Sequence, residues 1–447
     1  MSSLIMTPSG VRGLVGENFD PEIALRIAKA FGTYVEQGSV IVCGDTRESY
    51  DIYKSAVISG LLATGVDVID IGQAPTPTCQ QMIRHHCASG GIVITASHNP
   101  IEWNGIKLMG SAGSFLNDSD YQSFKTIYDS NEFPLSTWSD VGKYFSDTHA
   151  IEKHVDKILS AINTMPIQKA DLKVLIDTNN GTGCLADPIL LDKLGVSYDI
   201  LNEDPTKPFA HNPEPNESNL SELIQEMKSG NYDIGFAQDA DADRLVIVDE
   251  NGRFIGEDYS LGFCVDHILS ISDPSEAPVV VNLSTSSLIE RIAQRHNTTT
   301  TYTKIGETHV TQALRETGSI VGGEGNGGVI YPKIGWGRDS LIGIVIALSH
   351  LAAKKQTVSR IIQEYPEYYM ARDKFTVNNQ KDVTSFLSKV DKHFPSEKKD
   401  TQDGIKVYLN NSWVHVRPSN TEPIIRVFAE AGSTEEAEKL VKKVAAL

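Results

Sequence analysis

Residues 90–100, GGIVITASHNP, contain a short β-branched run that ends in a polar turn with a serine at its centre. The same order of strand-like run, polar or glycine-rich turn and helical pattern recurs along the chain. Such turns stand at residues 44–47, 95–100, 177–183, 238–244, 282–287 and 322–328. Continuous apolar strands separated by helices are typical of α/β layers with both sheet faces covered. Because ligands bind beyond the carboxyl ends of such strands, we expect these turns to face a shared cleft.

With 447 residues, the chain is too long for one hydrophobic core. Residues 366–447 differ from the rest, since strand-like runs follow one another until a final helix that opens with Ser433 and Glu436 at the spacing of a capping box. The sequence therefore predicts an α/β protein of three consecutive α/β/α domains with mixed sheets and a C-terminal α+β domain around a central cleft. The expected domains are 1–148, 149–252, 253–365 and 366–447.

Composition excludes several classes of protein. Asp and Glu total 58 against 40 Lys and Arg, a net charge of -18, so the surface repels nucleic acid and anionic lipid. The five cysteines form no C-x-x-C pair, which favours a reducing compartment over a disulfide framework. Residues 341–353 are the most apolar segment, but they are too short to cross a bilayer and indicate a buried helix. With no signal-peptide pattern, we expect a cytoplasmic protein without a membrane or nucleic-acid partner.

Ser97 lies in the turn TASHNP, beside the hydrogen-bonding side chains of His98 and Asn99. Serine is a poor nucleophile unless a base or an electrophile assists it. The G-x-S-x-G pattern is absent, so the nucleophile elbow of an α/β-hydrolase is not indicated. Taken alone, a serine in such a turn is more often structural than catalytic.

Three aspartates, Asp239, Asp241 and Asp243, alternate in the stretch DADADR. If this segment is extended, every second side chain points the same way, and three carboxylates converge on one hard cation. A calcium loop is the main competitor, because Glu250 stands at its twelfth position. Its sixth position, however, is Arg244 where an EF-hand needs glycine. Magnesium that holds a phosphate oxygen is the better interpretation, and an acidic surface turn remains the alternative.

Two later turns carry side chains suited to a sugar phosphate. In GEGNGG, residues 323–328, glycines allow close approach of a ligand, and Glu324 and Asn326 suit vicinal hydroxyl groups. No Gly-Lys-Ser/Thr follows, so this is not a P-loop. In RPSNTEP, residues 417–423, Arg417 offers a planar fork for phosphate, and the neighbouring Ser, Asn and Thr can complete an anion cradle.

Together these motifs resemble those of the α-D-phosphohexomutases, the family of phosphoglucomutase, phosphomannomutase and phosphoglucosamine mutase. TASHNP, D-x-D-x-D-R, G-E-x-x-G and R-P-S-N-T-E-P stand in the family's order and spacing. PSGVRG at 8–13 is similar to its N-terminal signature, and W-N-G-I-K ends at Lys107, ten residues past Ser97, as in the family. The resemblance covers nearly the whole chain. It implies an enzyme that interconverts hexose 1-phosphate and 6-phosphate through a phosphoserine and a sugar bisphosphate, with one Mg²⁺ ion.

The resemblance also implies a role for each matching position. Ser97 would carry the phosphoryl group and complete a magnesium site with the three aspartates of DADADR. Lys107 would be a general acid or base, with Arg12, His98 and Arg244 around the transferred group. The expected substrate-binding residues are Lys304, Glu324, Asn326, Arg417, Ser419, Asn420 and Thr421. The expected partner is a small phosphosugar, and the chain would act as a monomer or a homodimer.

Some features depart from the family pattern or fit another function. Many relatives carry Ser and a terminal His where this chain has Asn326 and Gly328, so the second general acid or base is not assigned. The stretch KIGE, which begins at Lys304, resembles the KVGD of phosphoglucosamine mutases and favours glucosamine phosphate over glucose or mannose phosphate. A metal-dependent phosphatase with Asp239 as nucleophile gives no role to Ser97. A non-catalytic sugar-phosphate sensor gives none to Ser97 or the three aspartates.

Overall fold

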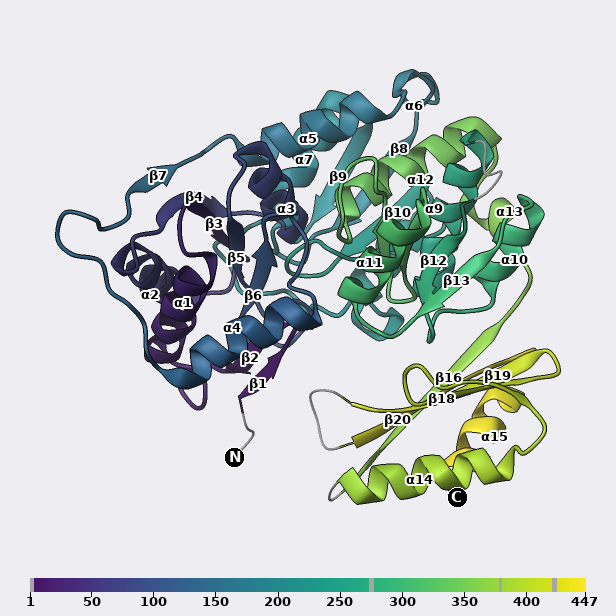
Figure 1. The fold of residues 1–447 in the computed structure, drawn as a ribbon. Coiled ribbons are helices and arrows are strands. Elements are labelled where there is room, and N and C mark those ends of the chain that lie inside the picture. The colour runs from purple at the N-terminus through teal and green to yellow at the C-terminus, as the bar shows by residue number, and fades with distance from the viewer. Residues whose placement is uncertain (1–3, 273–276, 378–379, 420–423) are drawn as a thin grey trace.

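The computed structural model describes residues 4–272, 277–377, 380–419 and 424–447, which form four sheets in chain order (Figure 1). The first sheet has the strand order β1-β2-β6-β5-β3-β4-β7. It is mixed, because β3 pairs in parallel with β4 and β5, whereas β6 runs antiparallel to β2 and β5. The elements of this unit are β1 (Ile5–Thr7), β2 (Gly10–Leu14), α1 (Pro21–Val35), β3 (Ser39–Gly44), α2 (Tyr50–Ala63), β4 (Asp67–Gln73), α3 (Thr76–His85), β5 (Gly90–Ile94), β6 (Trp103–Gly110), α4 (Asp118–Ser130) and β7 (Tyr144–Ser146).

Helices cover both faces of the first sheet. Alternate residues of a strand point to opposite faces. Val40 and Val42 pack in one core with residues of α1, α2 and α4, whereas Ile41 and Cys43 pack with α3 in another. Strand β3 is therefore apolar on both sides, which explains its continuous hydrophobic run.

The second and third sheets have four strands each, in the orders β11-β10-β8-β9 and β13-β12-β14-β15. Each contains two parallel pairs and one antiparallel pair. The second unit has α5 (Ala150–Ala161), α6 (Met165–Lys169), β8 (Lys173–Asp177), α7 (Gly183–Leu194), β9 (Ser197–Leu201), a 3₁₀ helix (Glu217–Asn219), α8 (Ser221–Met227), β10 (Ile234–Gln238) and β11 (Leu245–Val248). The third has α9 (Glu257–Ile271), β12 (Val279–Asn282), α10 (Leu288–Arg295), β13 (Thr300–Thr303), α11 (Glu307–Thr317), β14 (Gly322–Glu324), β15 (Gly328–Ile330), α12 (Ser340–Lys354) and α13 (Val358–Ile362).

Helix α12 joins the second and third units in one hydrophobic core. Its N-cap residue, Asp339, accepts a hydrogen bond of 3.0 Å from the backbone N–H of Leu341. The core contains α12 together with strand residues of both sheets, such as Ile176 and Val281. The buried helix expected at 341–353 is thus confirmed. Among the described residues, no helix has the length and apolar character needed to cross a membrane.

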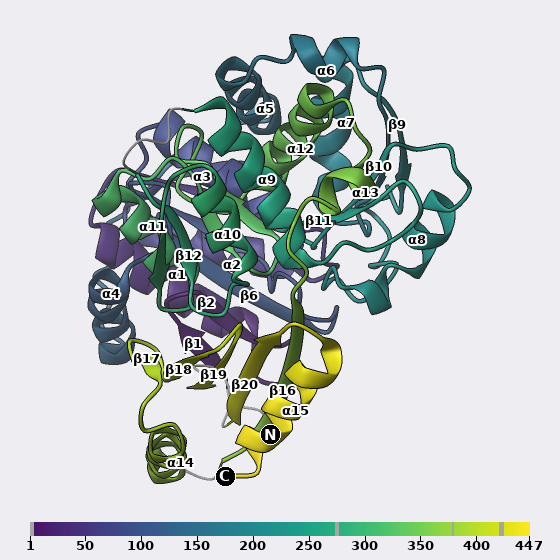
Figure 2. The ribbon, with the colours of Figure 1, turned by 90° about the vertical axis from the view of Figure 1, so that its right-hand side faces the viewer.

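The fourth unit is an antiparallel sheet in the order β16-β20-β19-β18-β17 with two helices. It comprises β16 (Tyr369–Thr376), α14 (Gln380–His393), β17 (Lys398–Asp400), β18 (Ile405–Leu409), β19 (Ser412–Pro418), β20 (Ile424–Ala431) and α15 (Thr434–Ala445). The Ser433 hydroxyl caps α15 by accepting the N–H of Glu436 at 3.2 Å. Both views show this unit beside the other three. The chain enters it from α13 through β16 (Figures 1 and 2). The expected fold, three mixed α/β units and a C-terminal α+β unit, is confirmed.

Candidate active site

Hydrogen bonds connect the polar turns that follow the strands. Ser97 of the turn at 95–100 donates to Asp239 of the turn at 238–244, with 2.9 Å between Oγ and Oδ2. Thr46 donates to the backbone carbonyl of Asn180 at 2.7 Å, which joins the turns at 44–47 and 177–183. In the third unit, the side-chain amide of Asn282 donates to Glu324 at 2.9 Å. The backbone N–H of Leu245, at the end of the aspartate turn, donates to the carbonyl of Gly327 in the third unit at 3.0 Å. Turns from three sheets therefore meet, as the turn pattern predicts.

The turn that carries Ser97 is built around the buried guanidinium of Arg47. Arg47 donates from Nε to Asp45 at 3.0 Å, and from its terminal nitrogens to the backbone carbonyls of Ser97, Asn99, Pro100 and Trp103 at 2.6–2.9 Å. All five N–H groups of the guanidinium thus have acceptors. Ser97 itself has a φ of 52°, in the left-handed region that non-glycine residues rarely adopt. The arginine holds this backbone in a conformation that presents the serine hydroxyl to the second unit.

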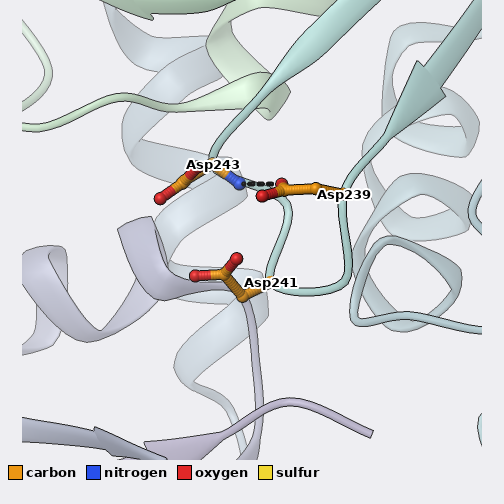
Figure 3. Close-up of side chains that lie close together, drawn as sticks. All are labelled: Asp239, Asp241 and Asp243. Carbon is orange, nitrogen blue, oxygen red and sulfur yellow. Dashed lines mark hydrogen bonds between the residues drawn. The ribbon is translucent and has the colours of Figure 1, made fainter. Parts of the chain in front are cut away.

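Asp239, Asp241 and Asp243 lie together and are fully buried, with one ligand oxygen of each within 4.8 Å of the others (Figure 3). They converge because residues 239–244 form a tight turn between β10 and β11, with Ala242 at a φ of 51°. The expectation that an extended segment aligns these side chains was wrong, although they do cluster. The turn is closed by Oδ1 of Asp239, which accepts the N–H groups of Asp243 and Arg244, each at 3.1 Å.

The donor set of this cluster fits a magnesium ion. Lys107 donates to Oδ2 of Asp241 at 2.6 Å and to Oδ2 of Asp243 at 3.0 Å, and the Thr76 hydroxyl also donates to Oδ2 of Asp241. The other oxygen of each, Oδ1, is buried and has no hydrogen-bond partner among the described residues. Buried unpaired carboxylate oxygens are costly unless a cation binds them, and carboxylate oxygens are what Mg²⁺ prefers. Burial and the charges of Asp243 and Asp241 raise the pKa of Asp239 well above its ordinary value.

Cationic side chains surround Ser97 and the aspartates. Arg12 donates to Asn99 at 3.0 Å, and Arg244 donates to Nδ1 of His98 at 2.9 Å. Burial, Arg244 and Arg12 lower the pKa of His98 well below its ordinary value. His98 is therefore neutral, and because Nδ1 accepts from the arginine, its proton is on Nε2. The structure thus brings Arg12, His98, Lys107 and Arg244 together around Ser97 and the aspartate turn.

Glu324 is buried at the end of β14 with defined partners for both oxygens. Its Oε1 accepts from Asn282 at 2.9 Å and from the backbone N–H of Gly306 at 3.2 Å, and Oε2 lies 3.4 Å from a terminal nitrogen of Arg338. Asn326 instead accepts the N–H of Gly328 at 3.3 Å within its own turn. Lys304 is exposed on the turn between β13 and α11.

Arg417 lies at the end of β19 and is buried. Its Nε donates to Oδ2 of Asp403 at 3.1 Å, and the same oxygen accepts the backbone N–H of Ile305 at 3.1 Å. One carboxylate therefore links the C-terminal unit to the turn that carries Lys304. The backbone N–H of Ser419 donates to the carbonyl of Ile424 at 2.9 Å. Asn420 and Thr421, also expected to bind substrate, lie outside the described residues.

Sequence reasoning missed several residues of this site. Arg338, Thr76 and Asp403 all contact expected site residues, and Arg47 was noted only as part of a turn. Most of the partners are at least 50 positions away, and Asp403 is 14 positions from Arg417, so spacing gives no signal for these contacts. The only local sign is that Arg338 follows Gly337 in GWGRDS, an arginine between apolar segments.

Matches to family models cover this site and nearly the whole chain. The phosphoglucomutase/phosphomannomutase models match as alpha/beta/alpha domain I at residues 4–135, domain II at 152–252, domain III at 257–369 and the C-terminal domain at 374–447. The chain therefore belongs to the phosphoglucomutase/phosphomannomutase family.

Individual relatives agree with this assignment. The chain is 40% identical over 443 residues to a phosphoglucomutase/phosphomannomutase of Thermococcus kodakarensis, with 97% of this chain and 96% of the relative covered. It is 36% identical over 435 residues to a probable phosphoglucosamine mutase of Methanopyrus kandleri, covering 97% and 95%. A solved structure of a phosphoglucomutase/phosphomannomutase family protein from Burkholderia thailandensis superposes with a TM-score of 0.85 at 26% identity, covering 98% and 95%.

Proposed function

We propose that this protein is a magnesium-dependent phosphohexomutase that interconverts hexose 1-phosphates and 6-phosphates through a phosphoryl group on Ser97. The observation that carries the proposal is the 2.9 Å hydrogen bond from the Ser97 hydroxyl to Asp239, because it brings the expected phosphoryl carrier to the carboxylate cluster. All four domain models of the family match in order. The proposed domains are residues 1–148, 149–252, 253–365 and 366–447.

Asp239, Asp241 and Asp243 would hold Mg²⁺, which neutralises charge on the transferred phosphoryl group when bound. Phosphoryl transfer needs mainly positioning and charge neutralisation. Arg12 and Arg244 supply further positive charge near Ser97, and neutral His98 lies with Nδ1 3.5 Å from the Ser97 hydroxyl.

In the first half-reaction, a sugar hydroxyl oxygen attacks phosphorus, the bond between phosphorus and Ser97 Oγ breaks, and the hydroxyl proton leaves. We assign the proton transfer to Lys107, whose Nζ donates to Asp241 and Asp243 within 3.0 Å. Its ammonium would give a proton to the departing Ser97 Oγ, and the amine left behind would take up the hydroxyl proton. The product is a sugar bisphosphate. It turns round and returns its other phosphoryl group to Ser97.

Glu324 would bind the sugar hydroxyls, and Arg417 and Ser419 with Asn420 and Thr421 would bind the phosphate that does not react. Lys304 would assist from its exposed turn, and Asn326 would contribute to the sugar loop. We favour glucosamine phosphate as substrate, because of KIGE and because several relatives are named probable phosphoglucosamine mutase. Glucose or mannose phosphate is the alternative, supported by the name of the relative with 40% identity. The protein would be cytoplasmic and act as a monomer or a homodimer.

A metal-dependent phosphatase with Asp239 as nucleophile is disfavoured, because it gives no role to Ser97, whose hydroxyl donates to Oδ2 of Asp239, or to Arg417. The proposal is tested by incubating the protein with Mg²⁺, a trace of sugar bisphosphate and the 1- and 6-phosphates of glucosamine, glucose and mannose. We expect interconversion and an acid-stable phosphoryl group on Ser97. Net release of inorganic phosphate without interconversion, or label on Asp239, would overturn it.

A further inference from the structure

Arg338 joins three turns that contribute to the candidate active site. It lies between β15 and α12, and only 7% of its surface is exposed. Its Nε donates to Oε2 of Glu307 at 2.8 Å, and a terminal nitrogen donates to Oδ2 of Asp243 at 2.8 Å. The other terminal nitrogen lies 3.4 Å from Oε2 of Glu324. One guanidinium thus contacts the aspartate turn, the turn that carries Glu324 and the start of α11.

The surroundings of Arg338 leave its side chain little freedom. Glu307 is held from the other side by the amide of Gln80 on α3, with 3.2 Å between Nε2 and Oε1. A Cβ atom on Gly328 would come within 2.1 Å of Cδ of Arg338, and one on Gly337 within 2.1 Å of Nε2 of Gln80. The side chains of Arg338 and Gln80 thus fill the space that a Cβ atom at Gly328 or Gly337 would take.

The contacts of Arg338 fix the orientation of two carboxylates with different expected ligands. Oδ2 of Asp243 accepts hydrogen bonds from Arg338 and Lys107. Its Oδ1 is buried in the aspartate cluster and has no hydrogen-bond partner among the described residues. Glu324 has Oε2 beside Arg338, while Oε1 accepts from Asn282 and Gly306. The planar guanidinium therefore sets the position of a metal-binding group relative to a sugar-binding group.

We propose that Arg338 is a positioning residue that holds the metal-binding turn and the sugar-binding turn in register. The inference rests on the proposed function, since it takes Asp243 as a magnesium ligand and Glu324 as a hydroxyl ligand. Because one planar guanidinium contacts both turns, a sugar bound at Glu324 presents its reacting hydroxyl to the phosphoryl group on Ser97. Small displacements of reacting groups are costly in such reactions. A positioning role predicts that metal affinity and sugar affinity change together when Arg338 is altered.

The test compares Arg338→Lys with two variants that each affect one turn. Lysine keeps the charge but cannot bridge three carboxylates in one plane. We expect Arg338→Lys to weaken Mg²⁺ binding roughly 10–100-fold, as for other residues that orient metal ligands, and to raise the KM for hexose phosphate about tenfold. Glu324→Gln is expected to raise the KM without changing Mg²⁺ affinity. Asp241→Asn, to which Arg338 makes no hydrogen bond among the described residues, is expected to weaken Mg²⁺ binding, and activity with it, without changing the affinity for hexose phosphate. Metal binding is measured by calorimetry on the intact protein.

A second variant, Glu307→Gln, keeps Arg338 but removes the charged acceptor of its Nε. We expect smaller changes in Mg²⁺ affinity and in the KM for hexose phosphate. Circular dichroism checks that each variant is folded. If Arg338→Lys and Glu307→Gln change only one of the two affinities, or neither, the positioning role is wrong. If the wild-type protein binds Mg²⁺ at the aspartates but converts no hexose phosphate, the proposed function fails. Calorimetric titration with hexose 6-phosphate then decides the positioning role separately: weaker binding of both ligands by Arg338→Lys supports it, and any other result overturns it.

Discussion

The hydroxyl of Ser97 donates a 2.9 Å hydrogen bond to Oδ2 of Asp239, although the two residues are 142 positions apart. Ser97 follows a strand of the first sheet and Asp239 a strand of the second, so the bond joins two different sheets. The hydrogen bond places a hydroxyl side chain against a cluster of carboxylates that fits a cation. Neither turn alone would indicate phosphoryl transfer, but their contact gives this chemistry a physical basis.

Replacing Ser97 by alanine should abolish net mutase turnover and leave the fold intact. The mutation removes the proposed phosphoryl carrier, while the Arg47 contacts that hold the turn go to backbone carbonyls and remain. A coupled mutase assay and labelling from sugar bisphosphate measure the effect. Ser89→Ala removes a half-buried serine whose hydroxyl donates to the backbone carbonyl of Gln37 at 2.7 Å, away from the candidate site, and should keep full activity. Near wild-type turnover by Ser97→Ala would refute the assignment.

Asp241→Asn should lower magnesium affinity and activity together. The change removes one of the converging carboxylates and the charged acceptor of the Lys107 ammonium, which lies at 2.6 Å. Calorimetric Mg²⁺ titration and activity at several Mg²⁺ concentrations measure both effects. Asp129→Asn, which removes an exposed partner of Lys125, serves as the control. An activity of the wild type that is indifferent to chelator would contradict the prediction.

Arg417→Ala should weaken binding of 1-phosphate and 6-phosphate substrates alike. A clamp for the distal phosphate serves both half-reactions, and loss of a charged hydrogen bond costs about 1.5–3 kcal/mol, or roughly 10–150-fold in KM. Kinetics in both directions provide the measurement, and Mg²⁺ affinity should be nearly unchanged. Lys442→Ala, on the exposed face of α15, removes a cation from the same unit as a control. An effect on one direction only, or on neither, would show that Arg417 is not the clamp.

Asp187→Asn should remove a contribution to the free energy of unfolding that decreases as pH rises. Burial raises the pKa of Asp187 in α7 from 3.8 to about 8. Between these values the folded protein keeps a proton that the unfolded chain releases, so the stabilisation is complete below pH 3.8 and is lost as pH rises through 8.

Melting temperatures of wild type and Asp187→Asn between pH 5 and 9 measure this component as a difference. We expect the wild type to lose stability relative to the variant as pH rises, since asparagine stays neutral at every pH. Asp192→Asn, on an exposed position of the same helix, serves as the control. Parallel pH profiles for Asp187→Asn and the wild type would contradict the expected ionisation.

The sequence predicted the parts of the site that local pattern determines. The layers, the polar turns and the aspartate cluster follow from strand periodicity and motif spacing. The predicted arrangement of the aspartates on an extended strand was wrong. A turn that includes Ala242 at positive φ brings them together. The roles of Arg338 and Arg47 could not be predicted, since both depend on acceptors that only the folded chain brings near. The structure shows Asn326 in a contact within its own turn.

The hydrogen bonds of Arg47 all end on residues between Asp45 and Trp103. The turn that presents Ser97 can therefore be completed on the ribosome as soon as the first sheet has emerged, because domains fold as units during synthesis. Asp243, in contrast, reaches its final environment only when Arg338 has been added to the chain. The turn that carries Ser97, the proposed phosphoryl carrier, can thus form early, whereas the aspartate cluster is completed only when three quarters of the protein has been made.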